Sequence, residues 1–338
     1  MRRSVGLVLI ALGAFFLALA PLVRFYVADQ VVLLPLNRYQ LTRLEAHNAT
    51  YFDATTLKAK TGVTLMANNT VRGDVRANNG DNRIAVWDST TNIFDEAKPD
   101  KPIQIQGFRI ALDRRTAELV QCCGVNVDGD NSVKLSGYAL VFPLANVQKR
   151  DYPFFDMTTR QSSPMRYAAT EKVDGLKVYR FDQQIPNTKT AALDTKLPAK
   201  LLGMDPKAPD QKVDRYSSAQ ISFWVDPRTG VPVKVRQNIH STVQTPDGRG
   251  TMTVAQADLN TVDKDQKGLI DLSNDSALKI NAVRSYIPVG SIFVGLSLLL
   301  LGLIVGVLAN RRAARAPKKP VRQSDGRFGD VQLPTQQP

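Results

Sequence analysis

The pattern of apolar and polar positions divides the chain into two uninterrupted apolar runs, one near each end, and a long alternating region between them. The first run is Ser4 to Val23 and the second is Ser285 to Asn310, and an arginine flanks each run on both sides. At about 1.5 Å rise per residue, either run can cross a hydrocarbon core of roughly 30 Å as a helix. The sequence therefore predicts transmembrane helices at residues 4–23 and 285–310.

Between these runs, stretches with a period of two are separated by turn residues. Ile221 to Val225 is followed by Asp-Pro-Arg-Thr-Gly and then by Val231 to Val235. Because Asp and Pro favour the start of a tight turn and Gly its end, this spacing predicts a strand, a turn and a strand. Three further hairpins are predicted around turns at residues 113–116, 174–175 and 247–248.

The stretch from Val233 to Val243 has the clearest alternation. Its odd positions are mostly apolar and its even positions are polar, which predicts one buried face and one solvated face. His240 falls on the solvated face, where we interpret it as a surface residue rather than a ligand. We expect residues 24–284 to form a β-rich domain, so the fold is mainly β: an antiparallel sheet (α+β overall) held by two terminal transmembrane helices.

Two short stretches next to the apolar runs have helical patterns. Ser273 is a suitable N-cap for a helix that continues through Ala277 to Val283, toward the second apolar run. On the other side, Phe25 to Val27 extends the first helix until Leu33-Leu34-Pro35 ends it. We expect these two stalks to meet and to support the sheet.

Basic residues beside the apolar runs predict the orientation of the chain. Met1-Arg2-Arg3 precedes the first run, and residues 311–338 contain seven basic residues. Short basic flanks stay in the cytoplasm, whereas the charge of a long translocated domain has little influence. We therefore expect a plasma (inner) membrane protein with residues 1–3 and 311–338 in the cytoplasm and residues 24–284 outside it.

A cleaved signal peptide is the alternative interpretation of the first run. The basic start, the apolar stretch and the small residues Ala18-Leu19-Ala20 fit that pattern. Pro21 would then follow the cut, where proline is a poor substrate for the peptidase. The run is also longer than the usual signal core of about 7 to 15 residues, so we favour an uncleaved anchor.

The formal net charge of +13 is mainly a signal of topology. More than half of it lies in residues 1–3 and 311–338, whereas nucleic-acid-binding proteins concentrate basic residues on one face or helix. We therefore expect no nucleic-acid partner. The tail after Ala316 is rich in proline and polar residues, which is typical of a disordered segment that contributes charge near the membrane or docks a cytoplasmic or lipid partner.

Aromatic residues are dense in one part of the alternating region. They are Phe142, Tyr152, Phe154, Phe155, Tyr167, Tyr179 and Phe181. One interpretation is that they fill the interior of the sheet and its covering loop. The other is that they line an apolar groove or tunnel for an acyl chain. Both agree with the sequence, and we take the seven residues as candidate ligand-binding residues.

The two cysteines, Cys122 and Cys123, are adjacent in the chain. Outside the cytoplasm they can bond to each other, because the chain offers no other partner. Such a ring would form a rigid turn, for which Gly124 supplies conformational freedom. The alternatives are two reduced thiols or a bridge between chains.

Motifs for catalysis and metal binding are missing from the sequence. His47 and His240 are far apart, and there is no H-E-x-x-H, no G-x-S-x-G and no phosphate-binding G-x-x-x-x-G-K-S/T segment. A pair of carboxylates, as in glycoside hydrolases, would form in space without a sequence signature. Asp113 and Asp226 adjoin turns, where aspartate ordinarily bonds the backbone. We expect no enzymatic activity, no cofactor and no metal site.

Several segments carry a resemblance to a known family. They are Tyr51-Phe52-Asp53, Cys122-Cys123, Asp151-Tyr152-Pro153-Phe154-Phe155-Asp156 and Trp224-Val225-Asp226-Pro227-Arg228-Thr229-Gly230. Together with both apolar runs, they resemble the actinobacterial DUF3068 family, often labelled the porin PorA family. The resemblance implies an actinobacterial cell-envelope protein with no cofactor or catalytic residue to carry over. The porin label disagrees with the apolar runs, because spanning barrels use strands of about 9 to 11 residues whereas long apolar helices are retained in the inner membrane.

Two terminal helices that hold a β-rich domain also resemble, in topology, the scavenger-receptor family, whose members pass lipids through an internal tunnel. We therefore expect a non-enzymatic envelope protein whose outer domain binds or transfers a lipid or another amphiphile. The alternatives are a scaffold that positions envelope enzymes and a porin-family protein that contributes to envelope permeability. The expected partners are the lipid bilayer, a lipid or amphiphile ligand and other envelope proteins.

Overall fold

The computed structural model describes residues 2–315, which divide into two compact units. Among the described residues, the helix unit comprises residues 2–22 and 287–315, and the sheet unit comprises residues 23–286. The predicted disordered tail, residues 316–338, lies outside the described residues.

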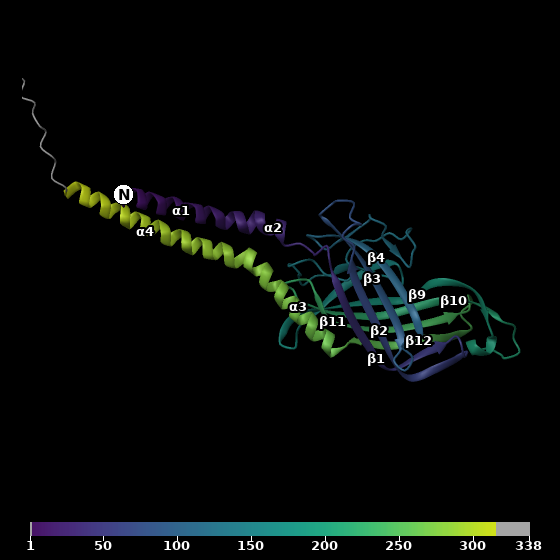
Figure 1. The fold of residues 1–338 in the computed structure, drawn as a ribbon. Helices are drawn as coiled ribbons and strands as arrows, with labels where there is room; N and C mark the ends of the chain where they lie inside the picture. The colour runs from purple at the N-terminus through teal and green to yellow at the C-terminus, as the bar shows by residue number, and fades with distance from the viewer. Residues whose placement is uncertain (1, 316–338) are drawn as a thin grey trace, which may run out of the picture. The chain divides into compact units, whose positions relative to one another are not determined.

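The sheet unit is built on a single antiparallel sheet of twelve strands that curls over one of its faces (Figure 1). The strand order is β5-β4-β3-β2-β1-β12-β11-β10-β9-β8-β7, with β6 paired to β4. Neighbouring strands are thus consecutive in the sequence within two groups, β1–β5 and β7–β12, and the two groups join where β1 pairs with β12. The strands are β1 (Tyr39–Asp53), β2 (Lys58–Gly73), β3 (Ile84–Asp95), β4 (Pro102–Asp113), β5 (Leu119–Val120), β6 (Asn126–Val127), β7 (Tyr152–Asp156), β8 (Gln161–Val173), β9 (Leu176–Leu197), β10 (Gln211–Val225), β11 (Pro232–Gln244) and β12 (Thr251–Thr261). The expected mainly β, antiparallel fold is confirmed.

Three of the four predicted hairpins are confirmed, with strands longer than expected. The turns at residues 226–230, 174–175 and 247–248 join β10 to β11, β8 to β9 and β11 to β12. The turn at residues 113–116 is confirmed only in part, because the strand that returns from it, β5, has two residues.

The predicted alternation in β11 is confirmed up to one irregularity. Arg236, Asn238 and His240 are exposed on the outer face, as expected. The register with β12 shifts between Ser241 and Thr242, and both residues are buried there. A bulge of this kind interrupts the period of two, which the sequence pattern did not signal.

A short segment, Ser136–Tyr138, connects the two outermost edges of the sheet. On one side, the Leu119 N–H donates a hydrogen bond of 2.8 Å to the Gly137 carbonyl oxygen. On the other side, the Tyr138 N–H donates to the Pro153 carbonyl (2.9 Å), and the Phe155 N–H donates to the Tyr138 carbonyl (2.8 Å). Gly137 has φ of +79°, and a Cβ there would collide with the Pro153 carbonyl, so a glycine is required. These bonds pair backbone groups that a sheet edge otherwise leaves free.

The main core lies where β3 and β4 meet β7 and the preceding loop. Trp87, Ile110 and Phe142 have no exposed surface there. The Trp87 indole N–H donates to the Pro35 carbonyl at 3.2 Å, which satisfies the one polar group of this buried ring.

Helix α3 (Asp263–Asn281) begins at Asp263, so the predicted start at Ser273 is wrong. The carboxylate of Asp265 instead fixes the first turn, because it accepts a hydrogen bond of 2.7 Å from the Arg43 backbone N–H and pairs with the Arg43 guanidinium at 2.6 Å. Asp263 and Asp265 both lie in the first turn, where the helix dipole favours negative charge. The first half of α3 is therefore hydrophilic, and the apolar pattern of the sequence indicated only the second half, from Ala277 onward.

Ser273 has a different role in the middle of this helix. Its hydroxyl is fully buried and donates to the Asp226 carboxylate at 2.9 Å. Asp226, in the β10–β11 turn, is also fully buried and accepts from the Arg228 guanidinium at 2.7 Å. Leu269 and Ile270 pack beside this network against buried valines of the sheet. The network therefore fixes α3 to the turn between β10 and β11.

The two predicted stalks meet within the sheet unit, as expected. They form π-helical segments at Val23–Val27 and Ala282–Tyr286, and α2 (Ala28–Val31) follows the first of them. The Arg24 guanidinium donates to the Arg284 carbonyl oxygen at 2.6 Å. The helical structure of the first stalk ends before Leu33, also as expected.

The helix unit consists of α1 (Arg2–Leu22) and α4 (Ile287–Arg315), which pack against each other through glycines. Cβ atoms placed at Gly6 and Gly13 would lie 3.2 Å and 2.9 Å from the carbonyl oxygens of Gly302 and Gly295. Such close approach of backbones is typical of helix pairs in membranes. Both helices are long and apolar enough to cross a membrane.

Candidate ligand-binding cavity

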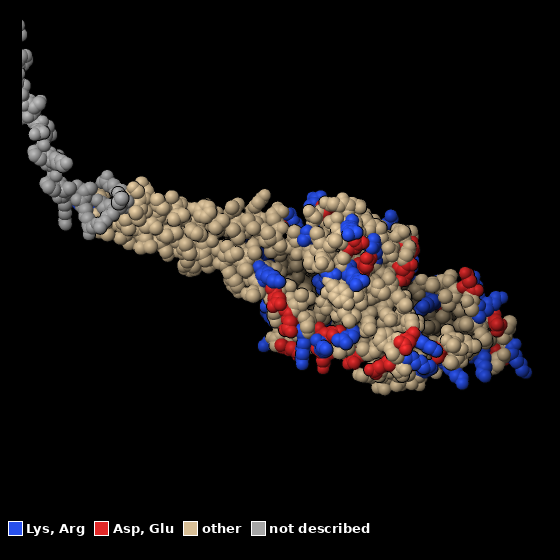
Figure 2. All heavy atoms as spheres, in the orientation of Figure 1, with Lys and Arg blue, Asp and Glu red and all other residues tan. Residues whose placement is uncertain are grey.

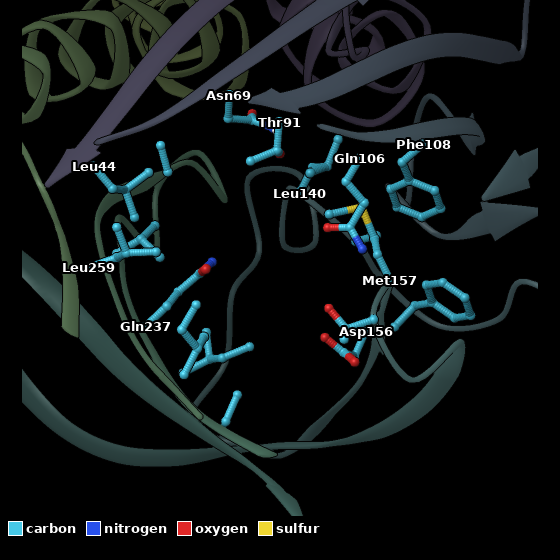
Figure 3. A pocket seen from close by; sticks show the side chains of 18 of the residues that line it. Leu44, Asn69, Thr91, Gln106, Phe108, Leu140, Asp156, Met157, Gln237 and Leu259 are labelled. Carbon is cyan, nitrogen blue, oxygen red and sulfur yellow. The ribbon is translucent and has the colours of Figure 1, made fainter. Parts of the chain in front are cut away.

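The curled sheet surrounds a cavity of about 430 Å³. Its wall comes from strands β1–β4, β7 and β9–β12 and from the loop segments 139–141 and 157–160. Figure 3 shows Leu44 and Leu259 on one side and Phe108 and Met157 on the other, all directed toward the same open centre. The volume lies in the range of sites that hold small organic ligands, about 300–1,000 Å³.

The inward positions of β10 change steadily in polarity along the strand. They are Arg215, Ser217, Ala219, Ile221 and Phe223, and all five line the cavity. Because side chains two residues apart in a strand share one face, this row passes from a charged group through a hydroxyl to aliphatic and aromatic side chains. This row of β10 is therefore polar at Arg215 and apolar at Phe223.

Neutral polar side chains lie among the apolar ones on the remaining strands. Gln106 and Gln237 face the cavity from β4 and β11 (Figure 3). The Asn69 amide donates to the hydroxyls of Ser89 and Thr91, at 2.9 Å each. Polar groups inside a fold need hydrogen-bond partners, so this interior suits an amphiphilic occupant or water better than a purely apolar filling.

The cavity also contains arginines without acidic partners. Arg215 on β10 reaches across the interior to β4, where its Nη2 donates to Gln104 Oε1 at 3.4 Å, and its Nε donates to Ser241 Oγ at 3.3 Å. Burial lowers the pKa of the Arg215 guanidinium from its ordinary value, and it does the same for Arg38. No acidic side chain of residues 2–315 forms an ion pair with either arginine.

The carboxylates of the cavity wall are held by other groups. Asp156 accepts hydrogen bonds of 2.7 Å from both the backbone N–H and the hydroxyl of Thr159. Asp128 accepts from the Gly107 N–H at 2.8 Å. Both carboxylates thus have neutral hydrogen-bond donors as partners, and neither forms an ion pair with Arg38 or Arg215.

The seven aromatic residues predicted as ligand-binding lie together, but only two of them line the cavity. Phe154 and Phe155 are part of its wall. Phe142, Tyr152 and Phe181 are buried beside them, with the ring centroids of Phe142 and Phe181 4.8 Å apart. These three residues match the interpretation that aromatics fill the core.

Tyr167 and Tyr179 lie at the margin of that aromatic group. Their rings meet edge to face with centroids 5.7 Å apart, and the Lys149 ammonium lies 5.5 Å from the Tyr179 centroid. Neither residue lines the cavity, so Phe154 and Phe155 are the two candidate residues that belong to its wall.

Sequence reasoning missed most of the cavity wall, including Gln104, Arg215 and Ser217. A signal was present in β11, where Gln237 and Ser241 interrupt an otherwise apolar inward face. Polar residues at positions that alternation assigns to a core indicate that the interior is not solid. In β10, Arg215 and Ser217 are likewise polar residues at positions on the inward face.

Cys122 and Cys123 are joined by a disulfide bond in the structure. Cys123 and Gly124 both have positive φ, 63° and 73°, so the turn uses the conformational freedom that the glycine supplies. Within residues 2–315, no group of three or more His, Cys, Asp or Glu side chains is arranged to hold a metal ion.

Comparison with known proteins places this architecture among named relatives. The family model described as Porin PorA matches residues 5–304. A protein from Corynebacterium resistens named Porin PorA is 24% identical over 217 residues, which cover 47% of this chain and 52% of that protein. A second Porin PorA, from Corynebacterium amycolatum, is 22% identical over 296 residues, covering 69% of this chain and 76% of that protein. The chain thus spans about half the length of the first of these relatives.

Proposed function

The chain belongs to the Porin PorA family, and we propose that it is a non-enzymatic, membrane-anchored envelope protein whose sheet unit binds an amphiphile in its interior. The observation that carries the proposal is the polarity gradient along β10, from Arg215 to Phe223, inside a cavity of about 430 Å³. An amphiphile has the same change of polarity along its length. Its tail would be removed from water along Ile221 and Phe223, which contributes roughly 25 cal/mol per Å² of apolar surface buried.

Exposed apolar surface on both helices supports the proposed membrane anchoring. Large apolar side chains such as Leu7, Phe15, Phe293 and Leu300 are exposed along α1 and α4. Figure 2 shows charged residues over the visible face of the sheet unit and none on the visible described part of the two helices. We propose that both helices span the plasma membrane, with the sheet unit on the extracytoplasmic side, because the basic residues flank the outer ends of the apolar runs.

The test is binding by the full chain in a non-ionic detergent or in lipid nanodiscs. Native mass spectrometry of the purified protein should detect a bound amphiphile, and the protein should bind a fluorescent fatty acid such as cis-parinaric acid at one site. Ala219→Trp, which fills the middle of the β10 row, should weaken that binding at least tenfold. The matched control Asn238→Trp places the same side chain on the exposed face of β11 and should leave binding unchanged.

The proposal fails if the wild-type protein carries no amphiphile and binds no probe. It also fails if Ala219→Trp and Asn238→Trp bind the probe equally well, because the site would then lie outside the cavity. Circular dichroism of each variant separates loss of binding from loss of folding.

A porin-type function is the second candidate, and the names of the relatives favour it. The outward row of β11, with Arg236, Asn238 and His240 exposed, is polar, whereas a lipid-embedded barrel is apolar on its outer face. We therefore rank a pore formed by the sheet below amphiphile binding. Stepwise conductance of the purified chain in planar bilayers would reverse that order.

A further inference from the structure

The cavity contains a positive charge that the protein itself does not neutralise, and this identifies the headgroup of the ligand. We propose that Arg215 binds the anionic headgroup of the amphiphile, a carboxylate or a phosphate, while the tail extends past Ala219 toward Phe223. This inference rests on the proposed function and adds the charge class of the ligand and the end at which the headgroup binds.

The contacts of Arg215 differ from those of other arginines in the sheet unit. Arg43, Arg109, Arg160, Arg228 and Arg236 each pair with an aspartate at 3.0 Å or less. Arg215, which is half-buried, has only an amide oxygen and a hydroxyl as acceptors, at 3.4 Å and 3.3 Å. A charge withdrawn from water without a counter-ion is costly, because neutral acceptors replace only part of its hydration.

The guanidinium has donors left for a ligand. It carries five N–H groups, and its two hydrogen bonds within residues 2–315 use one on Nε and one on Nη2. The remaining donors match the two oxygens of a carboxylate or phosphate in a bidentate arrangement, which is the strongest pairing open to arginine. The lowered pKa of Arg215 reflects the same unfavourable burial of charge, which a bound anion would relieve.

The position of Arg215 separates headgroup from tail. Its hydrogen-bond partners are polar, Ser241 on β11 and Gln104 across the interior, and Ser217 is the next residue on the same face of β10. The apolar part of the row begins at Ala219, four residues further along β10, and continues with Ile221 and Phe223. At about 3.3 Å per residue, this places the start of the apolar wall roughly 13 Å from the headgroup site, within the length of a long acyl chain.

Arg38 is the competing cation, but its surroundings are different. Its guanidinium carbon lies 5.0 Å from the centroid of the Trp87 ring, so the aromatic face already stabilises its charge. Trp87 pairs with Ile110 on β4, six residues from Gln104. Ile110 and Gln104 lie about 20 Å apart along β4, so the two arginines contact separate parts of the wall and Arg38→Gln is a suitable control for Arg215→Gln.

The experiment compares ligands that differ only in the headgroup. The full chain in non-ionic detergent is titrated at pH 7 with cis-parinaric acid and with its methyl ester. We expect the wild-type protein to bind the acid at least tenfold more tightly than the ester, a ratio that corresponds to about 1.4 kcal/mol. Arg215→Gln should bind both probes with the affinity of the ester, Arg215→Lys should keep part of the preference, and Arg38→Gln should keep all of it.

Competition by a long-chain alkyl phosphate and by a long-chain carboxylate then distinguishes the two sources of the anion, and the tighter competitor identifies the headgroup. The inference is overturned if the wild-type protein binds acid and ester alike, or if Arg38→Gln rather than Arg215→Gln removes the preference. The two proposals fail differently: binding of neither probe contradicts amphiphile binding itself, whereas equal binding of both contradicts only the anionic headgroup.

Discussion

The buried carboxylate of Asp226 should be one of the largest single polar contributions to the stability of the sheet unit. It has no exposed surface, and it accepts hydrogen bonds from the Arg228 guanidinium and from the hydroxyl of Ser273 on α3. Asp226→Ala would leave the Arg228 charge partly buried and the Ser273 hydroxyl without this acceptor. Removing one partner of a fully buried pair costs about 3–5 kcal/mol in the free energy of unfolding, and because 43% of the Arg228 side chain is exposed we expect the lower end, about 3 kcal/mol.

Asp258 provides a matched comparison within the same sheet. It pairs with the Arg236 guanidinium at 2.7 Å, the same distance as the Asp226–Arg228 pair, but 38% of the Asp258 side chain is exposed, compared with none for Asp226. Exposed pairs contribute about 0–1 kcal/mol because water and salt screen them. Asp258→Ala should therefore destabilise the chain by at most about 1 kcal/mol.

The measurement is urea unfolding of the full chain in detergent, followed by the fluorescence of its two tryptophans, Trp87 and Trp224. Trp87 is fully buried in the main core, so its emission reports on unfolding of the sheet unit. The slope of the transition should be equal in both variants, which allows their midpoints to be compared. If Asp226→Ala costs no more than Asp258→Ala, burial does not determine the strength of these pairs and the reasoning is refuted.

Three further outcomes are expected. Gly13→Leu should destabilise the packing of α1 on α4 by about 1–3 kcal/mol, because a Cβ there meets the Gly295 carbonyl oxygen at 2.9 Å. Gly290→Leu is the control and should not destabilise it, because the space around Gly290 is open. Titration with SDS, monitored by circular dichroism, compares the two variants, and equal sensitivity would contradict the glycine contact. Hydrogen bonding and charge from Arg43 hold the pKa of Asp265 below its ordinary value, so its contribution to stability is complete above the unfolded pKa near 3.9 and is lost as pH falls through the lower folded pKa. The difference in unfolding free energy between the wild type and Asp265→Asn should accordingly be constant from about pH 5 to 7 and shrink below about pH 4, and a constant difference down to pH 2 would contradict the ion pair. Alkylation followed by intact mass measurement should add no label to the non-reduced protein and two labels after reduction, and labelling without reduction would contradict the bond between Cys122 and Cys123.

The elements that the sequence predicted correctly are those whose signal is local. A turn such as Asp174-Gly175 constrains its own backbone, and the alternation in β11 reports directly on which residues face water. The apolar runs are equally local, since length and hydropathy alone decide whether a helix can cross a membrane. The start of α3 was missed because its first half is hydrophilic and depends on Asp265 meeting Arg43, a residue 222 positions away in the sequence.

The cavity could not be derived from the sequence for a related physical reason. Whether inward residues touch each other or leave a space depends on how far the sheet curls, and that curvature depends on pairings between distant segments. Arg215 and Gln104 are 111 residues apart, and nothing near either residue indicates that they face each other. The aromatic group was located correctly, but its density reflected a filled core more than a binding wall.

The seam between β1 and β12 has a consequence for the order of assembly. Each run of consecutive strands, β1 to β5 and β7 to β12, can form from local hairpins, whereas Leu44 and Thr261 must meet across almost the whole length of the domain. The strand synthesised last therefore completes the middle of the sheet rather than its margin. Until that strand has paired with β1, the inward faces of both halves stay exposed to solvent, so the incomplete sheet is the state most open to aggregation.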